Sequence, residues 1–156
     1  MPMRKLKEFL DAVGADYITT HHRPSYTASD TAHTCHIPGM NLAKTVVVRM
    51  NGELAMTVLP AHYMLDIFKL REFTMARSIK MAREEEFLTA FPECEEGAMP
   101  PFGNLFGMQV FAEESLSEDI NISFNAGSHT EVITMPFTQW QNLVHPFIAN
   151  IHSDKY

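Results

Sequence analysis

The chain has 156 residues, of which 46% are hydrophobic, and a formal net charge of −7 at pH 7. This length suits one ordinary domain that can bury a core without disulfide or metal support. The acidic balance argues against extended, non-specific binding to a nucleic-acid backbone, which requires a basic surface. No segment reaches the apolar length that crosses a bilayer, and no signal peptide is recognised, so we expect a cytoplasmic protein without membrane contact.

The cysteines and histidines raise the question of disulfides and metals. Cys35 and Cys94 have no CxxC spacing, so we expect free, buried thiols. His33 and His36 lie three residues apart on a predicted helix, but no further ligands follow at the spacing of a zinc finger or an HExxH site. We therefore expect no metal and no cofactor, and keep a small metal-dependent hydrolase built on these two histidines as an alternative.

The first elements of the chain are predicted from apolar periodicity and stop signals. Apolar residues at helical spacing predict a helix over residues 3–13, and alternation predicts a short strand at 17–21. Thr27 or Ser29 can cap a second helix that runs to about His36.

A β-hairpin is the clearest local signal. Two β-rich runs, 45–50 and 53–59, are joined by the two-residue turn Asn51-Gly52. Lys44 stands at the mouth of the first run, directly after Leu42-Ala43. Its stem is expected to be partly buried and its ammonium to reach a polar opening, where it suits a phosphate or a developing oxyanion. A lysine that keeps an edge strand soluble fits the same pattern, and both interpretations stay open.

The second half of the chain mixes helices and strands in the same way. We expect helices at 66–73, 83–90 and 136–143, strands at 108–112, 120–124 and 131–134, and a Pro- and Gly-rich loop over 91–107. Because the strongest strand pairs resemble hairpins, the fold class is predicted as α+β, with a curved, mixed, largely antiparallel sheet flanked by helices. We expect one compact domain over residues 1–156, with its core at about 5–143.

A positive strip interrupts the acidic background between Lys69 and Arg83. It holds five cations against the single acid Glu72. Such a strip can bind a few phosphates on an otherwise acidic protein, although an ordinary solvated surface explains it equally well.

The loop Gly97-Ala98-Met99-Pro100-Pro101 has the form GxxxP. The glycine allows the backbone to approach a ligand, and the prolines stiffen the loop. Exposed N–H groups of such a loop can stabilise an oxyanion without a side-chain nucleophile. The alternative is a rigid connector between a helix and a strand.

A glycine turn near the C-terminal end presents Ser128 and His129 between two apolar runs. Neighbours on a strand point to opposite faces, so their adjacency is no evidence for a Ser–His catalytic pair, and no GxSxG motif is present. His129 is a candidate for orienting or moving a proton, or else a polar surface residue.

Read in order, these segments resemble the YbaK and prolyl-tRNA synthetase-associated editing domains. The resemblance spans about residues 5–143. It is carried by His22, Thr27-Ala28, Ala43-Lys44-Thr45, Val58-Leu59-Pro60, Asp66, Gly97-x-x-x-Pro101-Phe102-Gly103, Glu114-Ser115-Leu116 and Phe124-Asn125-Ala126-Gly127-Ser128-His129-Thr130.

The resemblance implies a free-standing aminoacyl-tRNA deacylase, which hydrolyses the ester between a wrong, small amino acid and the terminal ribose of a tRNA. It places the catalytic groups at Lys44, Gly97 and His129. Substrate-binding positions are then Ala98, Met99, Pro100, Pro101, Phe102, Gly127, Ser128, His22 and Thr45. The expected partners are the tRNA acceptor end, touched by the positive strip, and a prolyl-tRNA or other aminoacyl-tRNA synthetase.

Two points stay open at this level. The same pocket in a non-catalytic module would bind an aminoacyl-adenosine or a synthetase partner without turnover. The identity of the amino acid is also open among alanine, cysteine, serine and threonine, because small pockets discriminate poorly by one methylene.

Overall fold

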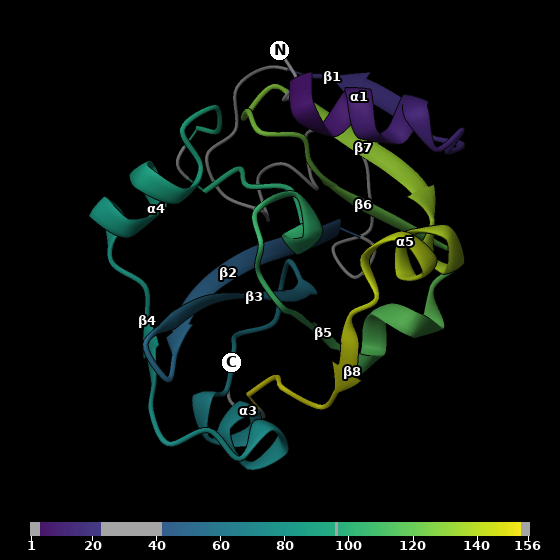
Figure 1. The fold of residues 1–156 in the computed structure, drawn as a ribbon. Coiled ribbons are helices and arrows are strands. Elements are labelled where there is room, and N and C mark those ends of the chain that lie inside the picture. Colours follow the sequence, from purple (N-terminus) through teal and green to yellow (C-terminus); the bar gives the residue numbers. More distant parts are fainter. Residues whose placement is uncertain (1–3, 23–41, 96, 154–156) are drawn as a thin grey trace.

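A computed structural model describes residues 4–22, 42–95 and 97–153, and its sheet forms the centre of the molecule (Figure 1). The strands are β1 (Ile18–His21), β2 (Leu42–Met50), β3 (Glu53–Pro60), β4 (Ile79–Met81), β5 (Val110–Glu113), β6 (Asn121–Asn125), β7 (Glu131–Pro136) and β8 (Phe147–Ala149). The helices are α1 (Arg4–Ala12), α3 (Ile67–Thr74), α4 (Glu84–Ala90) and α5 (Phe137–Val144), with short 3-10 turns η1 (Gly103–Leu105) and η2 (Glu114–Glu118).

The eight described strands form one mixed sheet in the order β1-β7-β6-β2-β3-β5-β8, with β4 paired to β2. Four pairs are antiparallel, namely β1–β7, β6–β7, β2–β3 and β2–β4, and three are parallel, namely β2–β6, β3–β5 and β5–β8. The prediction of an α+β fold with a mixed, largely antiparallel sheet is confirmed.

The predicted hairpin is present and longer than the sequence indicated. Asn51 and Gly52 have φ angles of 51° and 86°, as a type I′ turn requires. The Asn51 side-chain oxygen also accepts hydrogen bonds from the amides of Arg77 (2.8 Å) and Ser78 (3.1 Å). The turn thereby holds β4 against β2.

Helix boundaries follow local capping. The Asp66 carboxylate accepts bonds from the amides of Phe68 (2.9 Å) and Lys69 (3.2 Å) at the start of α3, and Pro136 precedes α5. The predicted helix from Thr27 or Ser29 to His36 lies outside the described residues. The sequence reading missed β4 and β8, which are only three residues long.

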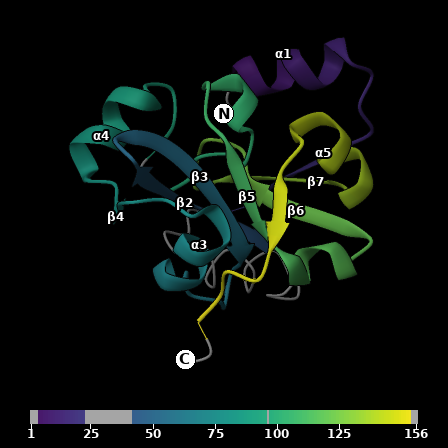
Figure 2. The ribbon, with the colours of Figure 1, turned by 60° about the horizontal axis from the view of Figure 1, so that its bottom comes forward.

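The sheet separates two apolar cores. The larger one joins α1 and α5 to one face of the sheet, through residues such as Leu6, Trp140 and Val47. The smaller one packs Leu70 of α3 against Val48 and its neighbours on the other face. Figure 2 shows α3 on the side of the sheet away from α1 and α5. Alternate residues of β2 therefore point into different cores.

Candidate functional site

The GxxxP loop docks directly onto the glycine turn that follows β6. The amide of Glu95 donates to the Gly127 carbonyl (2.8 Å), and the amide of Gly127 donates to the Ala98 carbonyl (2.9 Å). Gly97 and Gly127 have φ angles of 80° and 92°, a region that L side chains rarely adopt. Two segments thirty residues apart in sequence thus form one rigid unit.

His129 lies against Gly97 within this unit. A Cβ atom added to Gly97 would be 3.6 Å from His129 Cε1, so no side chain separates the glycine backbone from the imidazole. The His129 side chain is 9% exposed, and its Nε2 lies 4.0 Å from Glu95 Oε2. The same carboxylate oxygen accepts the His129 backbone N–H at 3.0 Å, which fixes the turn beside the ring.

Some backbone amides of the GxxxP loop are paired within the loop and others are not. The amide of Ala98 donates to the Glu95 carbonyl (3.1 Å) and that of Phe102 to the Pro100 carbonyl (2.8 Å). Within the described ranges, the amides of Gly97 and Met99 donate no backbone hydrogen bond. These two N–H groups have the chemistry of an oxyanion-binding pair.

The second half of the loop anchors the first. Met99 and Phe102 are buried in the larger core, so their side chains face away from solvent. Trp140 Nε1 donates to the Pro101 carbonyl at 3.0 Å. Gly103 is packed so tightly that an added Cβ would lie 2.4 Å from the Met108 carbonyl oxygen. What residues 99–102 can offer a ligand is therefore mainly backbone.

Ser128 and His22 lie beside the same turn. The Ser128 hydroxyl is 3.2 Å from that of Thr130, and the amide of His22 donates to the Thr130 carbonyl at 2.8 Å. Ser128 is 4% exposed and pairs within the turn, so it has the surroundings of a structural serine.

Lys44 approaches this turn along the neighbouring strand. Strands β2 and β6 are parallel, and their last paired residues are Ala43 and Phe124. The next residues along the two strands are Lys44 and Asn125. Ala43 and Phe124 point into the larger core, so Lys44 and Asn125 point to the opposite face. Lys44 is thus linked to the turn through Asn125, which precedes Gly127 by two residues.

The Lys44 ammonium is partly buried, and burial lowers its pKa below the ordinary value of 10.5. Among the described residues, no hydrogen bond or ion pair is made by this group. Thr45, the next residue, lies on the other face of β2 with Ala43 and Val47. The structure therefore does not place Thr45 on the same side of the sheet as Lys44.

Asn125 was not singled out from the sequence as a site residue. It is 8% exposed, and its buried Oδ1 has no hydrogen-bond partner within the described part of the chain. Most buried polar groups in proteins are paired, so an exception calls for an explanation. A polar residue at the end of the predicted strand 120–124, two positions before the Gly127 turn, is the sequence signal that could have found it.

The cations of the positive strip between Lys69 and Arg83 do not form one continuous surface in the structure. Lys69 Nζ donates to the His152 carbonyl (2.9 Å) and Arg71 to the Arg77 carbonyl (3.0 Å). Lys80 and Arg83 instead line a groove with Arg49 of β2. Its volume is about 560 Å³. Glu86 also lines it and pairs with Arg49 at 2.6 Å, so Lys80 and Arg83 carry its excess positive charge.

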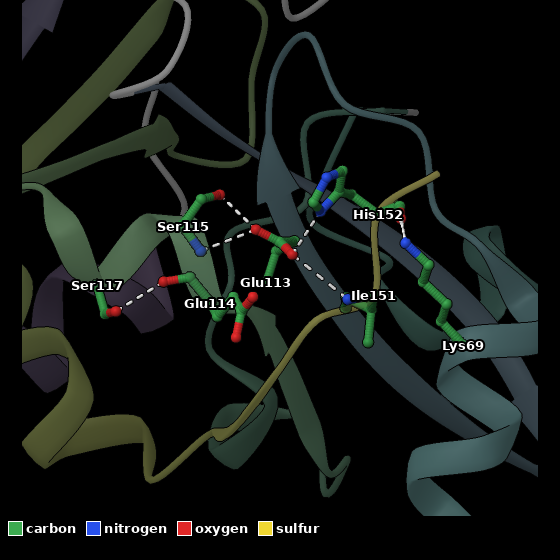
Figure 3. Close-up of polar contacts among 7 residues, drawn as sticks. All are labelled: Lys69, Glu113, Glu114, Ser115, Ser117, Ile151 and His152. Atoms are coloured by element: carbon green, nitrogen blue, oxygen red, sulfur yellow. Dashed lines mark hydrogen bonds and ion pairs between the residues drawn. The ribbon is translucent and has the colours of Figure 1, made fainter. Parts of the chain in front are cut away.

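A second polar cluster surrounds Glu113, the last residue of β5 (Figure 3). Its fully buried carboxylate contacts His152 Nδ1 (2.7 Å), the Ser115 amide (2.8 Å) and hydroxyl, and the Ile151 amide (3.4 Å). Burial alone would raise the pKa of Glu113, but the hydrogen bonds from Ser115 and His152 outweigh it and leave the pKa below 4.5. The cluster ties the C-terminal segment to η2.

The predictions about metal ligands and cysteine thiols concern residues other than Lys44 and those of the GxxxP loop. His33, Cys35 and His36 lie outside the described residues, and among the described ones no three His, Cys, Asp or Glu side chains converge to hold a metal. Cys94 is not in a disulfide among the described residues, and the pKa of its thiol is raised to about 12 by burial and by the nearby Glu93 charge. A thiol with so high a pKa is a poor nucleophile at neutral pH. None of the described helices is long and apolar enough to span a membrane.

Residues 22–143 match the model of the aminoacyl-tRNA editing domain family. The chain belongs to this family, which confirms the resemblance seen in the sequence, and its role is in aminoacyl-tRNA editing. Among curated proteins, no sequence matches the chain.

Solved structures share the fold at low sequence identity. The hypothetical protein APE2540 is 16% identical, with a TM-score of 0.86 over 96% of this chain and all of the other. A protein proposed as a trans-editing enzyme for prolyl-tRNA synthetase is 15% identical, with a TM-score of 0.82 over 97% of this chain and 96% of the other. A proposed signal transduction protein from Marinobacter aquaeolei VT8 is 16% identical, with a TM-score of 0.72, and matches 94% of this chain over 30% of its own length.

Proposed function

We propose that the protein is an aminoacyl-tRNA deacylase that removes a small, wrongly attached amino acid from the 3′ end of a tRNA. A water molecule attacks the ester carbonyl, a C–O bond to water forms, and the C–O bond to the ribose breaks. The proton lost by the water passes to the ribose oxygen. The products are the free amino acid and a tRNA with its terminal diol restored.

The contact between Gly97 and His129 carries the proposal. The docking bonds through Gly127 hold an imidazole against a loop whose Gly97 and Met99 amides are free of backbone partners among the described residues. Amides in this position suit the developing oxyanion, while His129 orients the water or moves its proton. An aminoacyl ester is already activated, so positioned water and a few donors suffice without a covalent nucleophile.

Lys44 supplies the cation. Its ammonium is partly buried and has no hydrogen-bond or ion-pair partner within the described part of the chain, and a charge in such surroundings interacts more strongly with a ligand than it would in water. We assign it to the ester carbonyl oxygen or to the terminal phosphate.

The groove lined by Lys80 and Arg83 is the proposed contact for the tRNA backbone. At about 3.3 Å per residue, Arg49 lies roughly 16 Å along β2 from Lys44, and its side chain points to the opposite face of the sheet. The groove is therefore assigned to backbone phosphates away from the end that Lys44 contacts. Changing Lys80 or Arg83 to glutamate should weaken tRNA binding and reduce its salt dependence. Hydrolysis of an aminoacyl-adenosine, which lacks the backbone, should not change.

The deciding experiment uses tRNAs charged with alanine, cysteine, serine or threonine, including tRNA for proline in view of the proposed trans-editing neighbour. The purified full chain should release at least one of these amino acids faster than buffer alone. His129→Ala should lower the rate per folded molecule, and because the ring is buried its thermal stability is measured alongside. Binding without release would support the non-catalytic module, and no binding and no release would contradict both.

A further inference from the structure

We infer that Asn125 reads the α-amino group of the substrate. Its carboxamide oxygen accepts a hydrogen bond from this group, while Lys44 on the adjacent strand binds the carbonyl side of the ester. The inference rests on the proposed deacylase activity and adds a specificity-determining residue to it.

The burial of Asn125 is the first observation. The residue is only 8% exposed, and its Oδ1 has no hydrogen-bond partner among the described residues. A buried polar atom without a partner lowers stability by about 1–3 kcal/mol. A packing role would be met by an apolar side chain without this penalty, so the oxygen is retained for a donor that arrives from outside.

Other polar side chains on this face of the sheet are satisfied, which is the second observation. Ser123, two residues earlier on β6, pairs with Thr134 of β7 at 2.7 Å. Thr57 of β3 donates to the Val46 carbonyl at 2.7 Å. Asn125 and Lys44 differ from both, since neither Asn125 Oδ1 nor the Lys44 ammonium has a partner in the described ranges.

The chemistry of the pair selects the ligand. Lys44 only donates and Asn125 Oδ1 only accepts, so together they fit a ligand with an acceptor and a donor close together. Neighbouring strands lie about 4.8 Å apart. In an aminoacyl ester the carbonyl oxygen and the α-amino nitrogen sit on adjacent carbon atoms, which matches side chains on adjacent strands. Phosphate and ester oxygens are acceptors and cannot satisfy Asn125 Oδ1.

The consequence is selection for a free α-amino group. An N-acylated residue, such as the last residue of a peptidyl-tRNA, has fewer amide protons and carries added bulk at the same nitrogen. The site would therefore hydrolyse aminoacyl esters and spare peptidyl esters.

The test compares alanyl-tRNA with propionyl-tRNA, which differ only in the α-amino group. Wild-type protein should hydrolyse the alanyl ester with a kcat/KM about 10- to 100-fold higher, as expected for one buried hydrogen bond. Asn125→Ala should lose this factor on alanyl-tRNA and stay within about twofold on propionyl-tRNA. Asn125→Asp, which keeps an acceptor, should retain the preference. If another amino acid is the better substrate, it is paired with its own des-amino analogue.

Ser123→Ala is the matched control, because Ser123 is a buried polar residue on the same strand and face whose hydroxyl is paired. It should change both substrates equally. Equal losses in Asn125→Ala on both esters would overturn the inference. So would a loss that disappears when the tRNA ends in 2′-deoxyadenosine, since the donor would then be the ribose hydroxyl. Failure of the wild type on every aminoacyl-tRNA would instead overturn the proposed function. Should Asn125→Ala fold poorly, the wild-type and Asn125→Asp ratios decide alone.

Discussion

Two buried polar residues each end a strand of the sheet, and their side chains have opposite hydrogen-bonding surroundings. Glu113 closes β5, and its carboxylate is contacted by Ser115, His152 and Ile151. Asn125 closes β6, and its Oδ1 has no partner. Satisfied buried groups hold a structure together, whereas unsatisfied ones lower stability and persist where a ligand completes them. We therefore expect changes at Glu113 to act on stability and changes beside Asn125 to act on activity.

Glu113→Ala should have the largest effect of all, on stability. Removing the carboxylate leaves the buried Ile151 amide and the half-buried donors of Ser115 and His152 without this acceptor, which should lower the free energy of unfolding by about 3–5 kcal/mol. Urea denaturation measures the loss. Glu114→Ala is the control, because Glu114 is exposed and only its backbone carbonyl accepts a bond, from Ser117. Deacylation per folded molecule should not change, and a specific loss of activity would contradict the structural role of Glu113.

Lys44→Met should have the opposite effect to Glu113→Ala, since it should lower activity and leave stability nearly unchanged. Loss of a preorganised cation typically lowers kcat by about 10²–10³-fold. Stability should stay within about 0.5 kcal/mol or rise slightly, because a partly buried ammonium without a described partner is removed. Lys7→Met on α1, also a partly exposed lysine, is the control and should leave both properties unchanged. A folded Lys44→Met variant with wild-type kcat would exclude Lys44 from catalysis.

Gly97→Ala should lower both stability and activity, each by a smaller amount. A non-glycine residue at a φ of 80° costs about 1–2 kcal/mol. The added methyl would sit 3.6 Å from His129, an ordinary contact that leaves the ring in place. The thermal midpoint should therefore fall by several degrees, while hydrolysis falls because the methyl occupies the ligand side of the loop. Ala98→Gly, which keeps the loop free of strain, should not show the same loss of activity.

The sequence was informative where the signal is local. The Asn51-Gly52 turn, the Asp66 cap and the GxxxP loop each depend on a few adjacent residues, and the structure has them. The parallel pairing of β2 with β6 joins segments about eighty residues apart in sequence, and no local pattern encodes it. The proximity of Lys44 to Asn125 follows from that pairing, so Asn125 was missed. The short strand β8 was missed because its three residues pair only with β5.

The pH dependence of the free energy of unfolding should distinguish Glu113, which acts in the acid range, from Lys44, which acts in the alkaline range. The folded pKa of Glu113 lies below its ordinary 4.5, so its contribution is present above 4.5 and is lost as the pH falls through the folded value. The folded pKa of Lys44 lies below 10.5, so the unfolded chain binds more protons in the window beneath 10.5 and stability rises with pH there. Urea midpoints of wild type, Glu113→Gln and Lys44→Met across both windows measure these slopes. Glu113→Gln should flatten only the acid slope and Lys44→Met only the alkaline one, because each variant removes a single titrating group. Part of the acid slope should remain, because hydrogen bonds from Arg83 and Arg49 also lower the pKa of Glu86. An acid slope that is unchanged in Glu113→Gln would assign the acid sensitivity to Glu86 and other carboxylates rather than to Glu113.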